Sequence, residues 1–130
     1  MRRKEREIKD LATMEKIIGG SSVCRMGLCD GDRPYVVPMN FGYREGKVYM
    51  HCAPEGRKLD VIGKNPHVCL EFEADLQMKY AQEACDFTMY YKSVIAWGRA
   101  EVLKEPEEKA RGMNVIMGHY TGKEYDFPAQ

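Results

Sequence analysis

Short segments of alternating hydrophobic residues, separated by turn residues, constrain the fold of this chain more than any other feature. We predict strands at 23–29, 34–41, 47–52, 67–73 and 87–103. Strands this short, with turn signals such as Asp30-Gly31-Asp32 between them, are typical of antiparallel sheets. In the last strand, every second residue from Val94 to Val102 is small and apolar, which fits the inside of a tight barrel. The pattern predicts a mainly β protein built as an antiparallel barrel.

Three further segments have helical patterns. We predict a helix at 10–18, which Asp10 caps, a short helix at 54–63, and a last helix that begins at Pro106 and ends near Gly122. Residues 74–83 fit neither pattern. The helices are expected to flank the barrel, covering an end or a side.

Composition excludes several functions. Lys plus Arg is 20 and Asp plus Glu is 20, so no net charge attracts nucleic acid or an anionic membrane. The five cysteines have no Cys-x-x-Cys spacing, which argues against zinc and against a secreted disulfide framework. No metal site is expected, and no stretch of eighteen apolar residues could span a membrane. These features predict a cytoplasmic protein with one domain, 1–130, and buried, reduced thiols.

Residues 51–58 form the most informative segment, because a strand ends there and a helix begins. The first N–H groups of a helix have no partner within it, and Gly56 allows another group to approach the backbone closely. Arg57 and Lys58 add two cations, so the segment has what a phosphate needs. The alternative is an ordinary helix start with two solvated basic residues.

Two polar residues nearby could act on a bound group. Asn40 lies in an apolar strand and must find hydrogen-bond partners; its amide could contact the edge of a heteroaromatic ring, or it could cap the loop at Gly42. His51 ends the strand beside the predicted phosphate site and could donate a proton. The alternative for His51 is a half-exposed strand histidine.

The strand at 87–103 has a second face that is aromatic and polar. It includes Tyr91, Ser93, Trp97 and Arg99, all expected to point outward. Such a face indicates a dimer interface or a wall that binds a ring. Packing against the terminal helix is the competing interpretation.

Taken in order, several segments resemble one family. The segments are 25–28, 35–43, 51–58 and 93–100, with 1–4 and 119–123 at either end. Together they resemble the pyridoxamine 5'-phosphate oxidase-like split-barrel flavoproteins, and within these the nitroimidazole-resistance subgroup. The resemblance covers nearly the whole chain.

The resemblance implies a homodimeric split β-barrel that binds FMN, or in some members FAD, in a groove between subunits. The residues it assigns to the cofactor are Pro38, Met39 and Asn40 along the isoalloxazine ring, His51, Cys52 and Ala53 beside it, Arg57 and Lys58 at the phosphate, and Tyr91 and Ser93 from the later strand. Members of the family continue past residues 119–123 with a strand that completes the barrel. This chain stops at Gln130, either because it is a short natural version or because a further part is missing, so we expect no completing strand within the given sequence.

The expected function is that of an FMN-dependent oxidoreductase that reduces a small aromatic acceptor, for which a nitroaromatic compound is one candidate, with electrons from a nicotinamide cofactor or another donor. His51 is the candidate catalytic residue. Two alternatives stay open: a non-enzymatic flavin-binding redox protein, and a split barrel that binds haem with His51 as an axial ligand.

Overall fold

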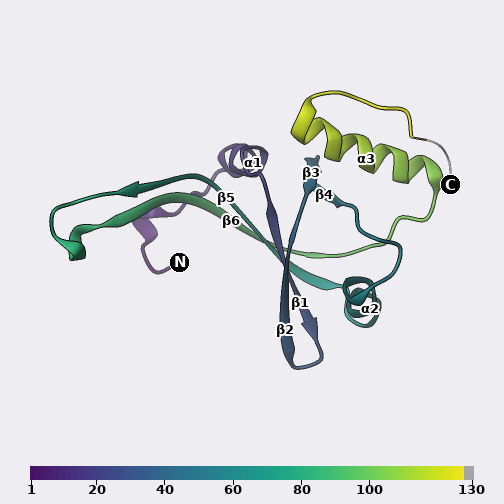
Figure 1. Ribbon diagram of the computed structural model, residues 1–130, viewed down its shortest axis with the longest axis horizontal. Helices are drawn as coiled ribbons and strands as arrows, with labels where there is room; N and C mark the ends of the chain where they lie inside the picture. Colours follow the sequence, from purple (N-terminus) through teal and green to yellow (C-terminus); the bar gives the residue numbers. More distant parts are fainter. Residues whose placement is uncertain (128–130) are drawn as a thin grey trace.

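The structure, a computed structural model, describes residues 1–127 (Figure 1). In chain order the elements are η1 (Lys4–Arg6), α1 (Leu11–Gly19), β1 (Cys24–Asp30), β2 (Arg33–Met39), β3 (Phe41–Arg44), β4 (Lys47–Met50), α2 (Arg57–Lys64), β5 (His67–Lys79), η2 (Ala84–Asp86), β6 (Thr88–Arg99) and α3 (Pro106–Thr121). Four strands form one sheet in the order β2-β1-β5-β6, and β3 and β4 form a second sheet. The described strand pairs are all antiparallel.

The prediction of a mainly β fold with antiparallel sheets and flanking helices is confirmed. Within residues 1–127, however, β2 and β6 are the open edges of the larger sheet, and β3–β4 forms a separate sheet. The two sheets do not close into one barrel there, so barrel closure stays a prediction.

The strand predicted at 34–41 is in fact two strands. β2 ends at Met39, β3 begins at Phe41, and only Asn40 lies between them, so the chain passes from one sheet to the other across a single residue. The connection to the predicted strand at 47–52 is shorter than expected, because β3 continues to Arg44. A two-residue turn follows, in which Glu45 (φ 49°) and Gly46 (φ 78°) both have the left-handed backbone of a type I′ hairpin turn.

The helices follow their local signals, with one correction. Asp10 caps α1 by accepting a hydrogen bond from the Thr13 N–H at 3.0 Å, and Gly122 ends α3 in a left-handed conformation. The short helix begins at Arg57 rather than at residue 54, because Gly56, with φ 144°, breaks the helical backbone just before it. No helix within residues 1–127 is long and apolar enough to cross a membrane.

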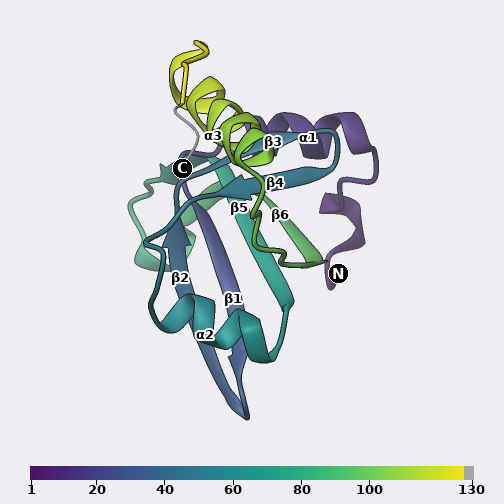
Figure 2. The same cartoon turned by 90° about the vertical axis from the view of Figure 1, so that its right-hand side faces the viewer.

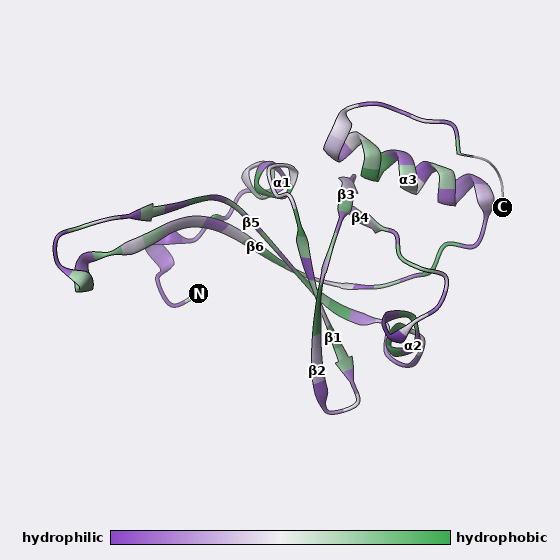
Figure 3. Cartoon of the chain, viewed as in Figure 1, coloured by the Kyte–Doolittle hydropathy of each residue, from purple (hydrophilic) through white to green (hydrophobic). Residues whose placement is uncertain are grey.

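β5 and β6 are paired from His67↔Arg99 to Lys79↔Thr88, much further than the predicted strand at 67–73. Figure 1 shows this hairpin extending away from the rest of the molecule. We call residues 74–92 the arm. A register shift between Ala74 and Gln77 marks its base. Figure 3 shows hydrophobic stretches continuing along it.

The core lies on the inner face of the larger sheet. Phe41 and Phe72 are fully buried, with their rings 5.1 Å apart in an edge-to-face arrangement. The other buried members are Ile18, Cys24, Met26, Leu28, Met39, Val61, Val68 and Leu70. α3 packs on β3 and β4, and Figure 2 shows it lying above them. We call this packed part, outside the arm, the body.

The expectation that the thiols are buried holds for Cys24 and is wrong for three others. Burial raises the pKa of Cys24 to about 12, so this thiol is protonated and inert at neutral pH. Cys29, Cys52 and Cys85 are exposed. Alternation explains Cys29, since it lies five residues after Cys24 in β1 and faces the other side of the sheet.

Candidate functional site

The register of the smaller sheet brings two of the predicted site residues together. Phe41 pairs with Met50 at one end of the β3–β4 hairpin. Asn40 directly precedes this pair and His51 directly follows it. The pairing itself ends at Phe41 and Met50, and Asn40 and His51 lie just outside the strands. Asn40 and His51 therefore start from the same end of the smaller sheet.

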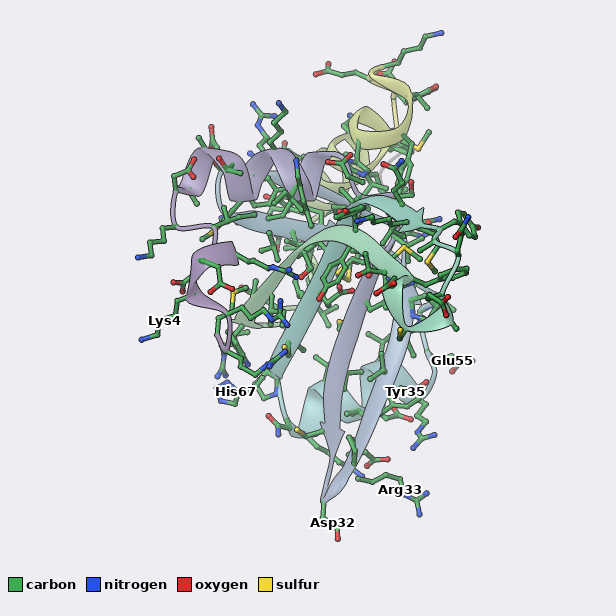
Figure 4. All side chains as sticks on the ribbon, turned by 90° about the vertical axis from the view of Figure 1, so that its left-hand side faces the viewer. Lys4, Asp32, Arg33, Tyr35, Glu55 and His67 are labelled. Carbon is green, nitrogen blue, oxygen red and sulfur yellow. The ribbon has the colours of Figure 1, made fainter. Side chains whose placement is uncertain are left out.

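The first turn of α2 packs against β2 at the same corner. The ammonium of Lys58 lies 3.6 Å from the sulfur of Met39. The guanidinium of Arg57 lies over the ring of Tyr35, 4.3 Å from its centroid, and contacts the carboxylate of Asp30 at 3.2 Å. Figure 4 shows Tyr35 and Glu55 on the same side of the molecule. The corner thus brings β2, the start of β3, the end of β4 and the start of α2 into one region.

The N-terminus of α2 is open. Its capping residue, Gly56, has no side chain that could accept from the first turn, and a Cβ at this position would meet nothing within 4 Å. The N–H groups of the first turn precede the first intrahelical bond, which runs from Asp60 to the Gly56 carbonyl at 3.1 Å. The helix start is therefore not blocked by other parts of residues 1–127.

The charges at this corner are unevenly compensated. The ion pair between Arg57 and Asp30 is about half exposed, and such surface pairs contribute about 0–1 kcal/mol. Lys58 forms no ion pair with any residue in 1–127; its one described hydrogen bond is to sulfur, a weak acceptor. Glu55 and Asp60 balance Arg57 and Lys58, so the formal charge of residues 55–60 is zero. An anion would therefore be held by directed donors rather than by net charge.

The remaining predicted residues of this corner differ in exposure. Met39 is buried and part of the core, whereas its neighbours Pro38 and Asn40 are exposed. His51, Cys52 and Ala53 form the exposed connection from β4 toward α2. These exposed residues leave backbone and side chains accessible to a ligand.

Tyr91 and Ser93 lie apart from this group. Ser93 lies on β6 and pairs with Glu73 of β5. In the larger sheet, β6 is the edge opposite β2. Three strand spacings separate the two edges, or about 14 Å. The pairings Pro38↔Arg25 and Arg25↔Glu71 show that Pro38 and Ser93 share the outer face of the sheet. One chain alone does not bring all ten predicted residues together.

The outer face of the larger sheet is apolar and exposed along β6. Trp97 is 79% exposed, Tyr91 62% and Ile95 53%. Because α3 packs on β3 and β4, it does not cover this face, and the alternative that the aromatic residues pack against the terminal helix is wrong.

An acidic cluster lies on the same outer face. Arg25 contacts Glu73 at 3.0 Å and Glu71 at 3.5 Å, beside a hollow of about 440 Å³. Burial, and then the charge of Glu73, raise the pKa of Glu71, and Arg25 offsets part of the shift. Oε1 of Glu71 is buried without a hydrogen-bond partner in residues 1–127. This face therefore already carries a partly desolvated charge.

A larger hollow, about 600 Å³, lies between β3 and α3 and includes Arg44, Arg111 and Lys123 in its lining. Neither hollow is lined by His51, Arg57 or Lys58. Residues 51–57 are exposed, so in the single chain the predicted phosphate corner is an open surface.

Sequence reasoning missed one residue at this corner. The hydroxyl of Tyr120, at the end of α3, accepts a hydrogen bond from the Phe41 N–H at 3.1 Å and donates to the Ser22 carbonyl at 2.7 Å. The same hydroxyl lies 3.5 Å from Oδ1 of Asn40. No local pattern could have indicated this contact, because 80 residues separate Tyr120 from Asn40.

Comparisons with known proteins agree with this fold. A curated relative, an uncharacterised protein of Rhizobium meliloti (strain 1021), is 28% identical over 90 residues, which are 67% of this chain and 50% of the relative. The chain thus spans about half the length of this relative. A solved structure of a candidate 5-nitroimidazole antibiotic resistance protein from Bacteroides thetaiotaomicron VPI-5482 is 34% identical, with a TM-score of 0.83 over 94% of this chain and 73% of that one.

A second solved structure, an FAD- and haem-binding protein from Mycobacterium smegmatis, has a TM-score of 0.77 over 87% of this chain and 55% of that one. Its identity is 13%, so it supports the fold alone. The family described as pyridoxamine 5'-phosphate oxidase matches residues 10–130, nearly the entire chain. With its antiparallel sheets and these matches, the chain belongs to the pyridoxamine 5'-phosphate oxidase family.

Proposed function

We propose that this chain binds FMN at the corner where α2 begins and uses it to reduce a small aromatic acceptor. The observation that carries the proposal is Lys58, a cation at an uncapped helix start that has no anionic partner within residues 1–127. Free N–H groups beside an unpaired ammonium are the usual protein site for a phosphate. Arg57 would exchange its weak pair with Asp30 for the same phosphate.

The ring of the flavin would lie beside Pro38, Met39 and Asn40. The amide of Asn40 offers both a donor and an acceptor, which the edge of an isoalloxazine ring also presents. Cys52 and Ala53 would line the path from ring to phosphate. FAD presents a phosphate to the same loop, so it is the alternative cofactor.

Bound flavin would supply the electron transfer, and the protein would position the reactants. His51 lies at the same end of the smaller sheet as Asn40 and is exposed. An imidazole there can orient an acceptor and give it a proton near neutral pH. A nicotinamide cofactor is the proposed electron donor. A nitroaromatic acceptor is supported by the 34% identity with a candidate nitroimidazole resistance protein.

A second copy of the chain would complete the site. Tyr91 and Ser93 are too far from Pro38 to share one ring with it within a chain, so in this proposal a partner subunit contributes them. The exposed outer face around Trp97 would be the contact surface. A net charge of zero does not oppose self-association. We place the protein in the cytoplasm, where the exposed cysteines would stay reduced.

The phosphate assignment is tested with Arg57→Ala and Lys58→Ala combined. We expect the flavin dissociation constant, measured by fluorescence titration, to rise about 100-fold, since two charge-assisted hydrogen bonds are lost. Lys104→Ala with Lys109→Ala is the control, because both side chains are exposed and far from α2 along the chain. Equal affinity in the two double variants would refute the assignment.

The catalytic role is tested with His51→Ala. We expect flavin affinity to be retained and reoxidation of the reduced flavin by a nitroaromatic to slow by about 100-fold or more, as for the loss of a general acid. Stopped-flow absorbance measures the rate. Equal rates would make His51 structural. A purified protein with a haem spectrum would favour the haem alternative, and flavin that no acceptor reoxidises would favour the non-enzymatic binder.

A further inference from the structure

The junction between the two sheets presents Asn40 in an unusual way. Asn40 is exposed, while Met39 before it is 7% exposed and Phe41 after it is fully buried. The chain leaves one sheet and enters the other at this residue. Two buried anchors thus fix the backbone on either side of a polar side chain that faces outward.

The last turn of α3 holds this junction in place. The Phe41 N–H points to the hydroxyl of Tyr120 at 3.1 Å, and the hydroxyl gives its proton to the Ser22 carbonyl at 2.7 Å. The ring of His119 lies against that of Phe41, with centroids 4.3 Å apart, and Nε2 of His119 is 2.7 Å from the Ser21 carbonyl. One helical turn therefore ties the junction to the segment between α1 and β1.

Close packing behind the junction leaves little freedom for it to shift. A Cβ at Gly42 would overlap the backbone carbonyl of Val115 in α3, so β3 lies directly against the helix. The position of Tyr120 relative to the junction is thereby set by backbone packing. Through the Phe41 N–H, the hydroxyl fixes the peptide between Asn40 and Phe41, and with it the position from which the Asn40 side chain extends.

We propose that Tyr120 is a positioning residue for the flavin site, because its hydroxyl fixes the peptide between Asn40 and Phe41 and so the position from which the Asn40 side chain meets the ring. This inference rests on the proposed function and deepens it. Tyr120 touches neither cofactor nor substrate in this proposal; it acts through Asn40. The competing explanation is that the hydroxyl serves stability alone.

The test is Tyr120→Phe, which keeps the ring and removes only the hydroxyl. We expect the flavin dissociation constant to rise about tenfold and the visible absorption bands of bound flavin to shift, since the hydrogen bonding at the ring edge changes. Tyr125→Phe is the matched control: Tyr125 is 42% exposed against 43% for Tyr120, and its hydroxyl has no described hydrogen bond in residues 1–127.

A double-mutant cycle separates positioning from stability. If Tyr120 acts through Asn40, then Asn40→Ala combined with Tyr120→Phe binds flavin no more weakly than Asn40→Ala alone. Additive effects would overturn the proposal, as would wild-type affinity and spectrum in Tyr120→Phe. A Tyr120→Phe protein that is unfolded by circular dichroism would make the hydroxyl structural and also overturn it.

The same titration tests the proposed function and the role of Tyr120 separately. Wild-type protein that binds no flavin refutes the proposed function, and this inference with it. Wild-type protein that binds flavin, together with an unaffected Tyr120→Phe variant, refutes only the role of Tyr120.

Discussion

The two halves of β5 differ in burial although both are rich in apolar residues. In the body, Val68, Leu70 and Phe72 are buried on the inner face of the sheet. In the arm, Leu76 is 57% exposed and Met78 37% exposed, and the apolar residues of β6 opposite them are exposed as well. The body has a second layer, made of helices and the smaller sheet, and the arm has none from residues 1–127. The comparison shows that an alternating pattern indicates which residues can be buried, whereas their burial also requires a second layer that covers them.

The largest expected effect is a loss of stability in the core of the body. Phe72→Ala removes a fully buried ring that packs on Phe41, and it should lower the free energy of unfolding by about 3–5 kcal/mol. Phe87→Ala is the matched change in the arm, where the ring is 44% exposed, and it should cost much less. Urea unfolding followed by circular dichroism, at low protein concentration, measures both. Equal losses would mean that the arm is packed as tightly as the body.

The next effect concerns the outer face of the larger sheet around Trp97, which is exposed as the arm is. Trp97→Glu puts a charge on the exposed outer face and should weaken self-association by about 30-fold or more, as for the loss of an aromatic anchor. The unfolding transition of the dilute protein should change little. Sedimentation velocity over a concentration series measures the association. Leu11→Glu, at a residue 67% exposed on α1, is the control, and similar loss of association there would refute the choice of face.

The smallest expected effect is a pH-dependent change in stability at Glu71, near the boundary between body and arm. The pKa of Glu71 is raised above its usual 4.5 by burial and by Glu73, so the folded state binds a proton more readily than the unfolded chain. Stability from this group is therefore complete below pH 4.5 and falls as pH rises through the folded pKa. Glu71→Gln should raise the melting temperature at pH 7 by about one or two degrees. At pH 4 it should leave the melting temperature unchanged.

Thermal melts at the two pH values test this, with the exposed Glu7→Gln as control. If a second copy covers the outer face, the gain at pH 7 should grow with protein concentration, because the cover desolvates Glu71 further. A Glu71→Gln variant that is less stable than wild type at pH 7 would show that the attraction of Arg25 outweighs burial.

Local signals in the sequence predicted the elements whose limits are set locally. Pro106 and Gly122 mark the ends of α3 as expected, and Asp10 caps α1. The division at Asn40 gave no such signal, since the inward positions Met39 and Phe41 keep the same alternation while the chain changes sheets. The length of the arm was missed for a related reason: its exposed apolar residues follow no one-sided pattern.

The candidate site could be predicted only where its residues are neighbours in sequence. Residues 51–58 were found as one segment, and the structure adds that β2 and the start of β3 meet them. Tyr120 reaches this corner from 80 residues away, through the packing of α3 on β3, which composition and periodicity do not encode.

The single residue between β2 and β3 also limits where this polypeptide tolerates insertions and deletions. One added residue there would turn Phe41 toward solvent and move Gly42 from beneath α3, since facing alternates along a strand. The hairpin tips at Gly31 and Gly46 have open space around them, and doubling a flexible loop costs only about 0.6 kcal/mol. Length variation among natural homologues, and any engineered peptide insertion in this half of the molecule, should therefore be found at those tips.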